Sequence, residues 1–342
     1  MRSFRYSTML LLATLLTSAV TSHADNSWRV TPDFIFKSQW LSETEPSPGL
    51  WLSAGIDAYK QFNGKNSTFA TATVQLYEWC VSDRVRKPPV LNGTDDCHLI
   101  SKVSTLEFHV SGDGKFNIVV GHPELPFGLE VPVSTNETIR TLLTPRDTGL
   151  KLDWGLGVKG TLSQWSYSAT LTRGSGFEWE NKSRTGEKPW AFAGRIGTAT
   201  DAQRFLPSEG FGFSWFTAEA LNPAQIRVKR WRLAADWIHY LGPWGLMTQL
   251  SIGQTEGRDV YNFFGEVNRS TPDESLTGYL QYKTFNEEFT PGWQAAQSVH
   301  LGARYAVTNK VTLSAQIARE FEVFAGGRPQ TIFDLQFRYR LE

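Results

Sequence analysis

The sequence predicts an all-β fold: a transmembrane antiparallel β-barrel of about 16 strands, with short periplasmic turns and long extracellular loops. Three observations support this prediction. Apolar and polar residues alternate strictly over many stretches, tight turns alternate along the chain with longer polar connections, and the chain begins like an exported protein. Such alternation is typical of strands that face lipid on one side and a polar lumen on the other.

The first 24 residues resemble a secretory signal peptide. Arg2 and Arg5 precede an apolar run at 9–16, and small residues follow up to Ala24, where we expect cleavage. The run is too short to cross a bilayer as a helix, which takes roughly 20 apolar residues, and no later stretch approaches that length. The mature chain, residues 25–342, is therefore expected to cross the membrane with strands.

The composition fits a barrel and excludes one class of function. The chain contains 13 Trp, 22 Phe and 10 Tyr residues, and outer-membrane barrels place aromatic residues in girdles at both membrane interfaces. Its mean hydropathy of −0.31 would suit a soluble protein. In a barrel, however, the apolar outer face and the polar inner face average to a similar hydropathy. The 34 basic and 34 acidic residues balance, which excludes a strongly basic nucleic-acid binder.

The C-terminal segment shows the alternation well. Apolar residues with an aromatic majority occupy one face of it, and charged or amide residues occupy the other. The first set is Phe333, Leu335, Phe337, Tyr339 and Leu341, and the second is Asp334, Gln336, Arg338 and Arg340. We expect Phe333, Phe337 and Tyr339, together with Trp165 and Tyr167, to face lipid or a neighbouring subunit, and Arg338 and Arg340 to face the lumen.

Counting back from this strand, and letting it descend to the periplasm, predicts sixteen strands with both chain ends periplasmic. Tight turns such as Thr308-Asn309 separate neighbouring strands, and 258–267 is the weakest of the set. Fourteen or eighteen strands remain open. The predicted ranges are 33–41, 50–62, 67–80, 99–111, 115–122, 147–159, 163–174, 190–199, 209–220, 227–240, 244–256, 258–267, 274–285, 293–307, 310–324 and 329–341.

The two cysteines predict a disulfide. Cys80 and Cys97 lie at the facing ends of two candidate strands, and the oxidising periplasm favours their pairing. A bridge here would close the neck of one extracellular loop and stabilise the fold by roughly 3 kcal/mol through loop entropy. A metal or redox pair is the alternative, but the spacing matches no common site.

One segment carries a family resemblance. Residues 116–130 read FNIVVGHPELPFGLE, and residues 146–150 read RDTGL. Together they resemble the phosphate-selective porin (O and P type) family, in which a strand ends in Gly plus a basic residue and is followed by a Pro-Phe-Gly turn, a loop and an Arg-Asp-x-Gly strand start. His122 stands where that family more often has arginine, and no arginine ladder can be matched.

The resemblance implies a sixteen-stranded porin, usually a homotrimer, in which the loop 123–146 folds inward and narrows the pore. The expected function is a water-filled channel in the bacterial outer membrane, through which small polar or anionic solutes diffuse passively. The partners would then be outer-membrane lipid and these solutes. No cofactor, metal or nucleic acid is expected.

Charged residues predicted to face the lumen are the candidate site. In the inward loop, Glu124 and Glu130 near one end would oppose Arg140 and Arg146 near the other and create a transverse field. Further candidates for the pore lining are Lys151, Asp153, Arg230, Arg232, Arg338 and Arg340, and Glu107, His109, Asp236, Arg304 and Asp334 are also predicted to face inward. Many of these are expected to be ordinary wall residues held in salt bridges.

Two other functions remain open at this point. A barrel scaffold for an exported partner, such as a periplasmic or surface cytochrome, would lack its own haem motif, as this chain does. An outer-membrane hydrolase would need a Ser/His or Asp/His pair near the rim. Ser298 and His300 share a predicted inner face, but no histidine lies in a recognisable catalytic motif. We therefore expect no enzyme.

Overall fold

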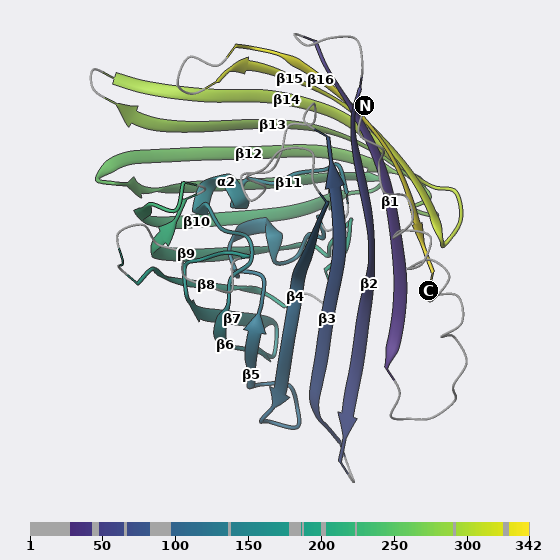
Figure 1. Cartoon of the computed structure of the whole chain (residues 1–342), viewed down its shortest axis with the longest axis vertical. Helices are drawn as coiled ribbons and strands as arrows, with labels where there is room; N and C mark the ends of the chain where they lie inside the picture. Colours follow the sequence, from purple (N-terminus) through teal and green to yellow (C-terminus); the bar gives the residue numbers. More distant parts are fainter. Residues whose placement is uncertain are drawn as a thin grey trace.

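Sixteen antiparallel strands close into one barrel in the computed structural model of the chain (Figure 1). Each strand pairs with its neighbours in sequence, and β1 pairs with β16. The structure describes residues 28–42, 48–64, 67–82, 97–135, 138–177, 186, 188–199, 203–222, 224–289, 292–323 and 328–341. The predicted signal peptide, 1–24, lies outside the described residues.

All sixteen predicted strands are present, including the weakest. The first eight are β1 Arg29–Leu41, β2 Gly49–Asn63, β3 Thr68–Val81, β4 Cys97–His109, β5 Asn117–His122, β6 Gly155–Leu162, β7 Trp165–Thr172 and β8 Trp190–Thr198. The others are β9 Gly210–Leu221, β10 Arg227–Leu241, β11 Trp244–Thr255, β12 Arg258–Ser270, β13 Leu276–Phe289, β14 Gly292–Ala306, β15 Val311–Glu322 and β16 Thr331–Arg340.

The period-two pattern separates the two faces of the barrel. On β16, Phe333, Leu335 and Phe337 are exposed on the outside, whereas Asp334 and Gln336 are buried on the inside. Exposed apolar residues continue over the other strands and form a belt around the barrel. In the membrane this belt faces lipid and not water. Closure leaves no open sheet edge, so backbone groups inside the membrane are paired.

The register fixes where the chain ends lie. Asp33 near the start of β1 is opposite Arg340 near the end of β16, so both ends of the barrel sequence lie at one rim. This rim is called the periplasmic end, following the predicted orientation. The connections at the other rim include the long ones after β3, β5 and β7, as expected.

Three connections depart from the short-and-long rule. At the extracellular rim only two residues separate β11 from β12, and only two separate β13 from β14. Glu256 and Gly257 make the first of these turns with φ values of 51° and 78°, the left-handed backbone that a two-residue hairpin requires. At the periplasmic rim, eleven residues separate β8 from β9, which is unusually many.

The predicted strand 147–159 is wrong in its first half. Residues Thr144–Thr148 form the short helix α2, and β6 begins only at Gly155. A proline near the start of α2 and Gly149 after it, with φ of 81°, favour a helical turn with a left-handed end. Among the described residues, no helix has the length and apolar character needed to cross a membrane.

A disulfide joins Cys80 at the end of β3 to Cys97 at the start of β4, which confirms the predicted pairing. The two cysteines face each other directly across the strand pair. The bridge therefore closes the long connection 82–96 at its neck.

Candidate functional site

The connection between β5 and β6, residues 123–154, enters the lumen and is named the inward segment. In Figure 1 it lies with α2 inside the ring of strands. β5 ends at His122, opposite Ser104 in the middle of β4, so the chain leaves the wall at mid-height. The predicted inward loop 123–146 makes up most of this segment.

Apolar contacts hold the inward segment against one side of the lumen. Leu129, Val133 and Leu143 are fully buried, and they pack in one cluster with wall residues of β10 to β14, among them Met247 and Phe264. These wall positions are exceptions to the polar inner face. Fully burying each such side chain contributes roughly 1.5–3 kcal/mol, so the segment has a defined position and is not a loose loop.

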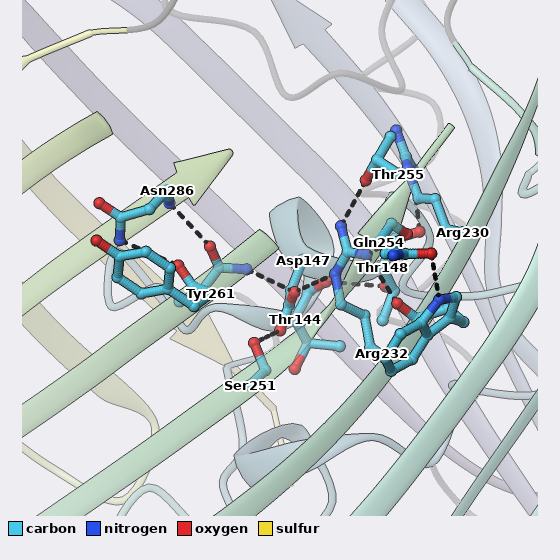
Figure 2. A network of polar contacts seen from close by, with 12 residues as sticks. Thr144, Asp147, Thr148, Arg230, Arg232, Ser251, Gln254, Thr255, Tyr261 and Asn286 are labelled. Atoms are coloured by element: carbon cyan, nitrogen blue, oxygen red, sulfur yellow. Dashed lines mark hydrogen bonds and ion pairs between the residues drawn. The ribbon is translucent and has the colours of Figure 1, made fainter. Parts of the chain in front are cut away.

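Asp147 of the Arg-Asp-x-Gly motif anchors the segment to the wall. Its buried carboxylate accepts hydrogen bonds from Arg232 Nε at 2.8 Å and Asn262 Nδ2 at 2.7 Å, and also from the Ser251 hydroxyl. Figure 2 shows the contacts of Asp147 with Arg232 and Ser251 beside α2. Desolvation by burial raises the pKa of Asp147, and the three donors oppose that shift by favouring the charged form. The motif is thus an anchor of the inward segment.

Gly149 allows the wall to approach α2 closely. A Cβ at this position would lie 1.6 Å from Arg230 Nη1, and φ is 81°. The guanidinium of Arg230 donates to the Thr148 carbonyl at 3.0 Å. Arg230, predicted to line the pore, instead covers the end of α2 and is only partly exposed.

Of the two arginines predicted to form the constriction, one is buried and the other is exposed. The side chain of Arg140 is completely buried, and its Nη1 lies 3.2 Å from Glu266 Oε1 on β12. Arg146 is exposed, but it lies over the Phe285 ring, 4.4 Å from its centre. The segment packs against the β10–β14 wall and carries both arginines there, and their role in a constriction stays a prediction.

Two further predicted pore residues are also buried. Arg232 forms an ion pair with Asp147. The Asp153 carboxylate accepts hydrogen bonds from the backbone N–H groups of Ser175 and Gly176 at 3.1 and 3.0 Å. Neither reaches the open lumen. Their charges serve to attach the inward segment to its surroundings, since a buried charge is stable only when it is paired or hydrogen-bonded.

The carboxylates of the inward segment share one lysine. Lys151 Nζ lies 3.1 Å from Glu130 Oε2 and 3.6 Å from Glu124 Oε1. Glu124 and Glu130 also border a cavity of about 740 Å³ that extends along β4 to β7, with Glu107 and Lys159 on the opposite wall. The predicted cluster therefore exists with Lys151 in place of the arginines.

A second cavity of about 470 Å³ lies between the inward segment and the opposite wall, and it is named the eyelet. The inward segment contributes Ser134 and Thr138 to its lining. Among the described residues, five basic side chains and one acidic side chain, Asp57, line the eyelet. The basic residues are Lys102, Arg304, Lys310, Arg338 and Arg340.

Ion pairs cross the seam where β1 meets β16, beside the eyelet. Arg338 Nε lies 2.9 Å from Asp33 Oδ1, and Arg340 Nη1 lies 2.7 Å from Asp57 Oδ2. The Tyr77 hydroxyl is 3.0 Å from Asp33 and 2.9 Å from Asp57. This seam network contains two arginines and two carboxylates, so it carries little net charge. Arg338 and Arg340 face the lumen, as predicted.

The connection between β8 and β9 closes the underside of the inward segment. Residues Arg204 and Val133 form a parallel bridge, and Gln203 Nε2 donates to Glu124 at 2.9 Å. The ring of Phe205 lies 3.9 Å from the Arg140 guanidinium and borders the eyelet. A connection from the periplasmic rim thus contributes to the lining of the eyelet.

Comparison with known proteins identifies the architecture. No family model matches the chain, and no curated protein matches it. Among solved structures, an anion-selective porin from Comamonas acidovorans is similar over 92% of this chain and 100% of its own, with a TM-score of 0.68 at 9% identity. The chain has the fold of an outer-membrane porin.

Two further structures agree with the porin fold. OprB of Pseudomonas putida is similar over 96% of both chains, with a TM-score of 0.65 and 11% identity. OmpT of Vibrio cholerae, described as an outer membrane protein in a trimer form, is similar over 92% of this chain and 99% of its own, with a TM-score of 0.61 and 12% identity. The predicted fold class is confirmed. The finer resemblance to the phosphate-selective family stays a prediction.

The sequence did not single out several residues that border the eyelet. Gln203 and Phe205 lie in an irregular connection, and Lys310 lies in a tight turn, so none shows a strand pattern. Lys102 lies over the Tyr77 ring, 4.7 Å from its centre, next to a strand irregularity that disturbs the alternation. The unusual length of the β8–β9 connection was the one available signal.

The described residues include one group whose atoms could converge on a metal ion: Glu78, Cys80 and Cys97. Both of these cysteines belong to the disulfide, so neither offers a thiolate.

Proposed function

We propose that the protein forms a water-filled channel across the bacterial outer membrane and lets small polar solutes, and anions in particular, diffuse through it. One observation carries the proposal: a polar cavity of about 470 Å³ lies inside a closed porin barrel, and the charged side chains described in its lining are mostly basic. Charges that line a pore influence which ions pass.

The anion preference follows from the balance of charges around the eyelet. The seam network neutralises Arg338 and Arg340 with Asp33 and Asp57. Arg304 and Lys310 then leave a net positive potential in the eyelet. On the other side of Gln203, the larger cavity is bordered by Glu107, Glu124 and Glu130, which pair with Lys159 and Lys151. The excess positive charge therefore lies at the eyelet, a different position from the one predicted.

Single-channel recording in planar bilayers tests the proposal. We expect stepwise conductance in potassium chloride, and a reversal potential under a salt gradient that shows preference for chloride. The variant Lys151→Met should shift the reversal potential toward cations, because it unpairs Glu124 and Glu130. Purified, folded protein that gives no conductance steps would contradict the channel function. A reversal potential on the cation side would contradict the anion preference.

We also propose that the channel is a homotrimer and has no enzymatic activity. The trimer form described for Vibrio cholerae OmpT supports the first part at the level of fold. The hydrolase alternative has one supporting observation, since Ser298 Oγ lies 3.0 Å from His300 Nε2 on β14. Ester or peptide hydrolysis that Ser298→Ala abolishes would revive it. The mass of the detergent-solubilised protein tests the trimer.

The scaffold alternative has less support. The inward segment packs against one side of the lumen and borders the eyelet on the other. A partner inside the barrel would need the space that this segment already occupies. An exported cytochrome could then dock only on a rim. Copurification of a haem protein with the barrel would favour the scaffold over the channel.

A further inference from the structure

A furrow runs across the outer face of the barrel near its periplasmic end, and we name it the outer furrow. Three small residues that are opposite one another on neighbouring strands form its floor: Gly278 on β13, Ala303 on β14 and Ala315 on β15. On each strand the small residue lies between two large, exposed apolar side chains, because alternate residues of a strand share a face. These walls are Leu276 and Leu280 on β13, Leu301 and Tyr305 on β14, and Leu313 and Ile317 on β15.

The packing of the barrel itself does not require a glycine in this floor. A Cβ added at Gly278 would meet only the carbonyl oxygen of Gly302, at 4.0 Å, which is an ordinary contact. A glycine inside a strand weakens the sheet, and it often marks a place where a ligand approaches the backbone closely. The space above Gly278 is therefore open to the surroundings of the barrel, and in the membrane these are lipid.

The outer furrow leads from Arg269 at the rim toward the middle of the membrane. Arg269 is opposite Gly278, and it is the second residue from the periplasmic end of β12. Gly278, Ala303 and Ala315 are the third, fourth and fifth residues from the periplasmic ends of their own strands. Neighbouring strands lie about 4.8 Å apart, so the floor spans about 10 Å. This is the course that an acyl chain takes from the headgroup level into the bilayer.

Arg269 places a cation at the head of the outer furrow. Its guanidinium lies over the Trp244 indole, 5.1 Å from the ring centre, and both side chains are exposed. Among the described residues, no carboxylate lies within ion-pair distance of Arg269. A guanidinium that rests on an aromatic face keeps its N–H groups in its own plane, where a phosphate can accept two parallel hydrogen bonds. Lipid phosphates lie at the same level as the aromatic girdle.

We propose that the outer furrow and Arg269 bind one anionic glycerophospholipid of the inner leaflet. Its phosphate would accept hydrogen bonds from Arg269, and one acyl chain would lie along Gly278, Ala303 and Ala315. Phosphatidylglycerol complements the arginine, whereas the choline ammonium of phosphatidylcholine offsets its own phosphate. A second copy of the chain would instead have to bury the charge of Arg269 against an apolar belt, which is unfavourable. The site lies outside the lumen, so it goes beyond the proposed channel function.

Native mass spectrometry of the purified, folded protein tests the site, with dioleoyl phosphatidylglycerol or dioleoyl phosphatidylcholine added to the detergent. The unchanged protein should retain phosphatidylglycerol at a lower lipid concentration than phosphatidylcholine. Arg269→Gln should raise the half-saturating concentration of phosphatidylglycerol about tenfold, as expected for loss of a charge-assisted bidentate pair, and should abolish the preference. Gly278→Leu should also weaken binding of both lipids, because the new side chain fills the outer furrow while the charge stays the same.

Two matched controls place the same kinds of substitution elsewhere on the outer face. Arg319→Gln removes an exposed charge near the extracellular end of β15, and Ala235→Leu enlarges an exposed small residue on β10. Both should bind lipid like the unchanged protein. Equal weakening by Arg269→Gln and Arg319→Gln would overturn the site, because net charge alone would then explain the binding. Ala303→Leu gives a second test of the floor if Gly278→Leu does not fold.

Three other results would overturn the proposal. Equal binding of the two lipids by the unchanged protein would show that Arg269 does not select the headgroup. Unchanged binding of phosphatidylglycerol in both Gly278→Leu and Ala303→Leu would show that no acyl chain occupies the outer furrow. Separation of an oligomer into single chains by Gly278→Leu, with lipid binding unchanged, would identify a second copy as the occupant. Single-channel conductance should be the same in all these variants, since the exchanged residues lie outside the lumen, so none of these results would affect the channel function.

Discussion

Replacing Asp147 by asparagine should release the inward segment from the wall. The change keeps the shape of the side chain but removes the charge that pairs with buried Arg232 at 2.8 Å. Removing one partner of a buried ion pair costs about 3–5 kcal/mol, because the other charge remains buried without compensation. The lower figure applies here, since asparagine can still accept from Ser251 or Asn262. It corresponds to a roughly hundredfold larger population with a detached segment.

Limited trypsin digestion of the folded protein in detergent measures that population. Cleavage between Arg140 and Lys151 requires the segment to leave its helix and its wall contacts, so the rate follows the detached fraction. We expect cleavage there to accelerate by about two orders of magnitude in Asp147→Asn. Single-channel conductance should also rise, because a detached segment widens the lumen.

Two further variants show whether the reasoning is sound. Asp113→Asn changes an exposed carboxylate that pairs with Lys115 in a periplasmic turn, and it should leave digestion unchanged. Adding Arg232→Met to Asp147→Asn removes the unpaired buried charge and should restore part of the protection. If Asp147→Asn resisted trypsin as well as the unchanged protein, Asp147 would not be the anchor.

Three other changes test separate parts of the structure. Gly149→Ala should destabilise the inward segment by about 1–3 kcal/mol through its left-handed backbone and its clash with Arg230, and the same digestion measures the effect. Phe337→Lys should lower the stability of the barrel by roughly 2–4 kcal/mol, measured by urea unfolding in lipid vesicles, whereas normal stability would reverse the assigned faces. Reducing the Cys80–Cys97 bridge should lower the free energy of unfolding by roughly 3 kcal/mol without changing the chloride preference; two reactive thiols in the unreduced protein would contradict the bridge.

The wall of the barrel could be predicted because each strand carries its own signal. A residue on β16 faces lipid or lumen according to its parity, and turns such as Thr308-Asn309 mark where the chain reverses. Neither signal depends on distant residues. The strand 258–267, which the sequence supported least, is also a full strand. It pairs with both neighbouring strands and extends to residue 270.

The interior could not be predicted to the same degree, because a lumen-facing charge gives no sign of what covers it. Arg140 pairs with Glu266, which is 126 residues away, and Asp147 pairs with Arg232, 85 residues away. In the sequence these residues look the same as Arg338, which does border the eyelet. The short helix α2 was also not predicted. The inward segment leaves the wall there, so its apolar and polar residues no longer need to alternate.

The position of the eyelet beside the β1–β16 seam links channel formation to the last step of barrel assembly. Asp33 is contributed by the first strand and Arg338 by the last, so their ion pair forms only when the two ends of the sheet meet. Before closure, Arg338 would lack its ion pair with Asp33, and the lumen would be open on that side. The lining of the eyelet is therefore complete only in a barrel whose β1 and β16 are paired. A channel with normal selectivity would indicate that the sheet has closed.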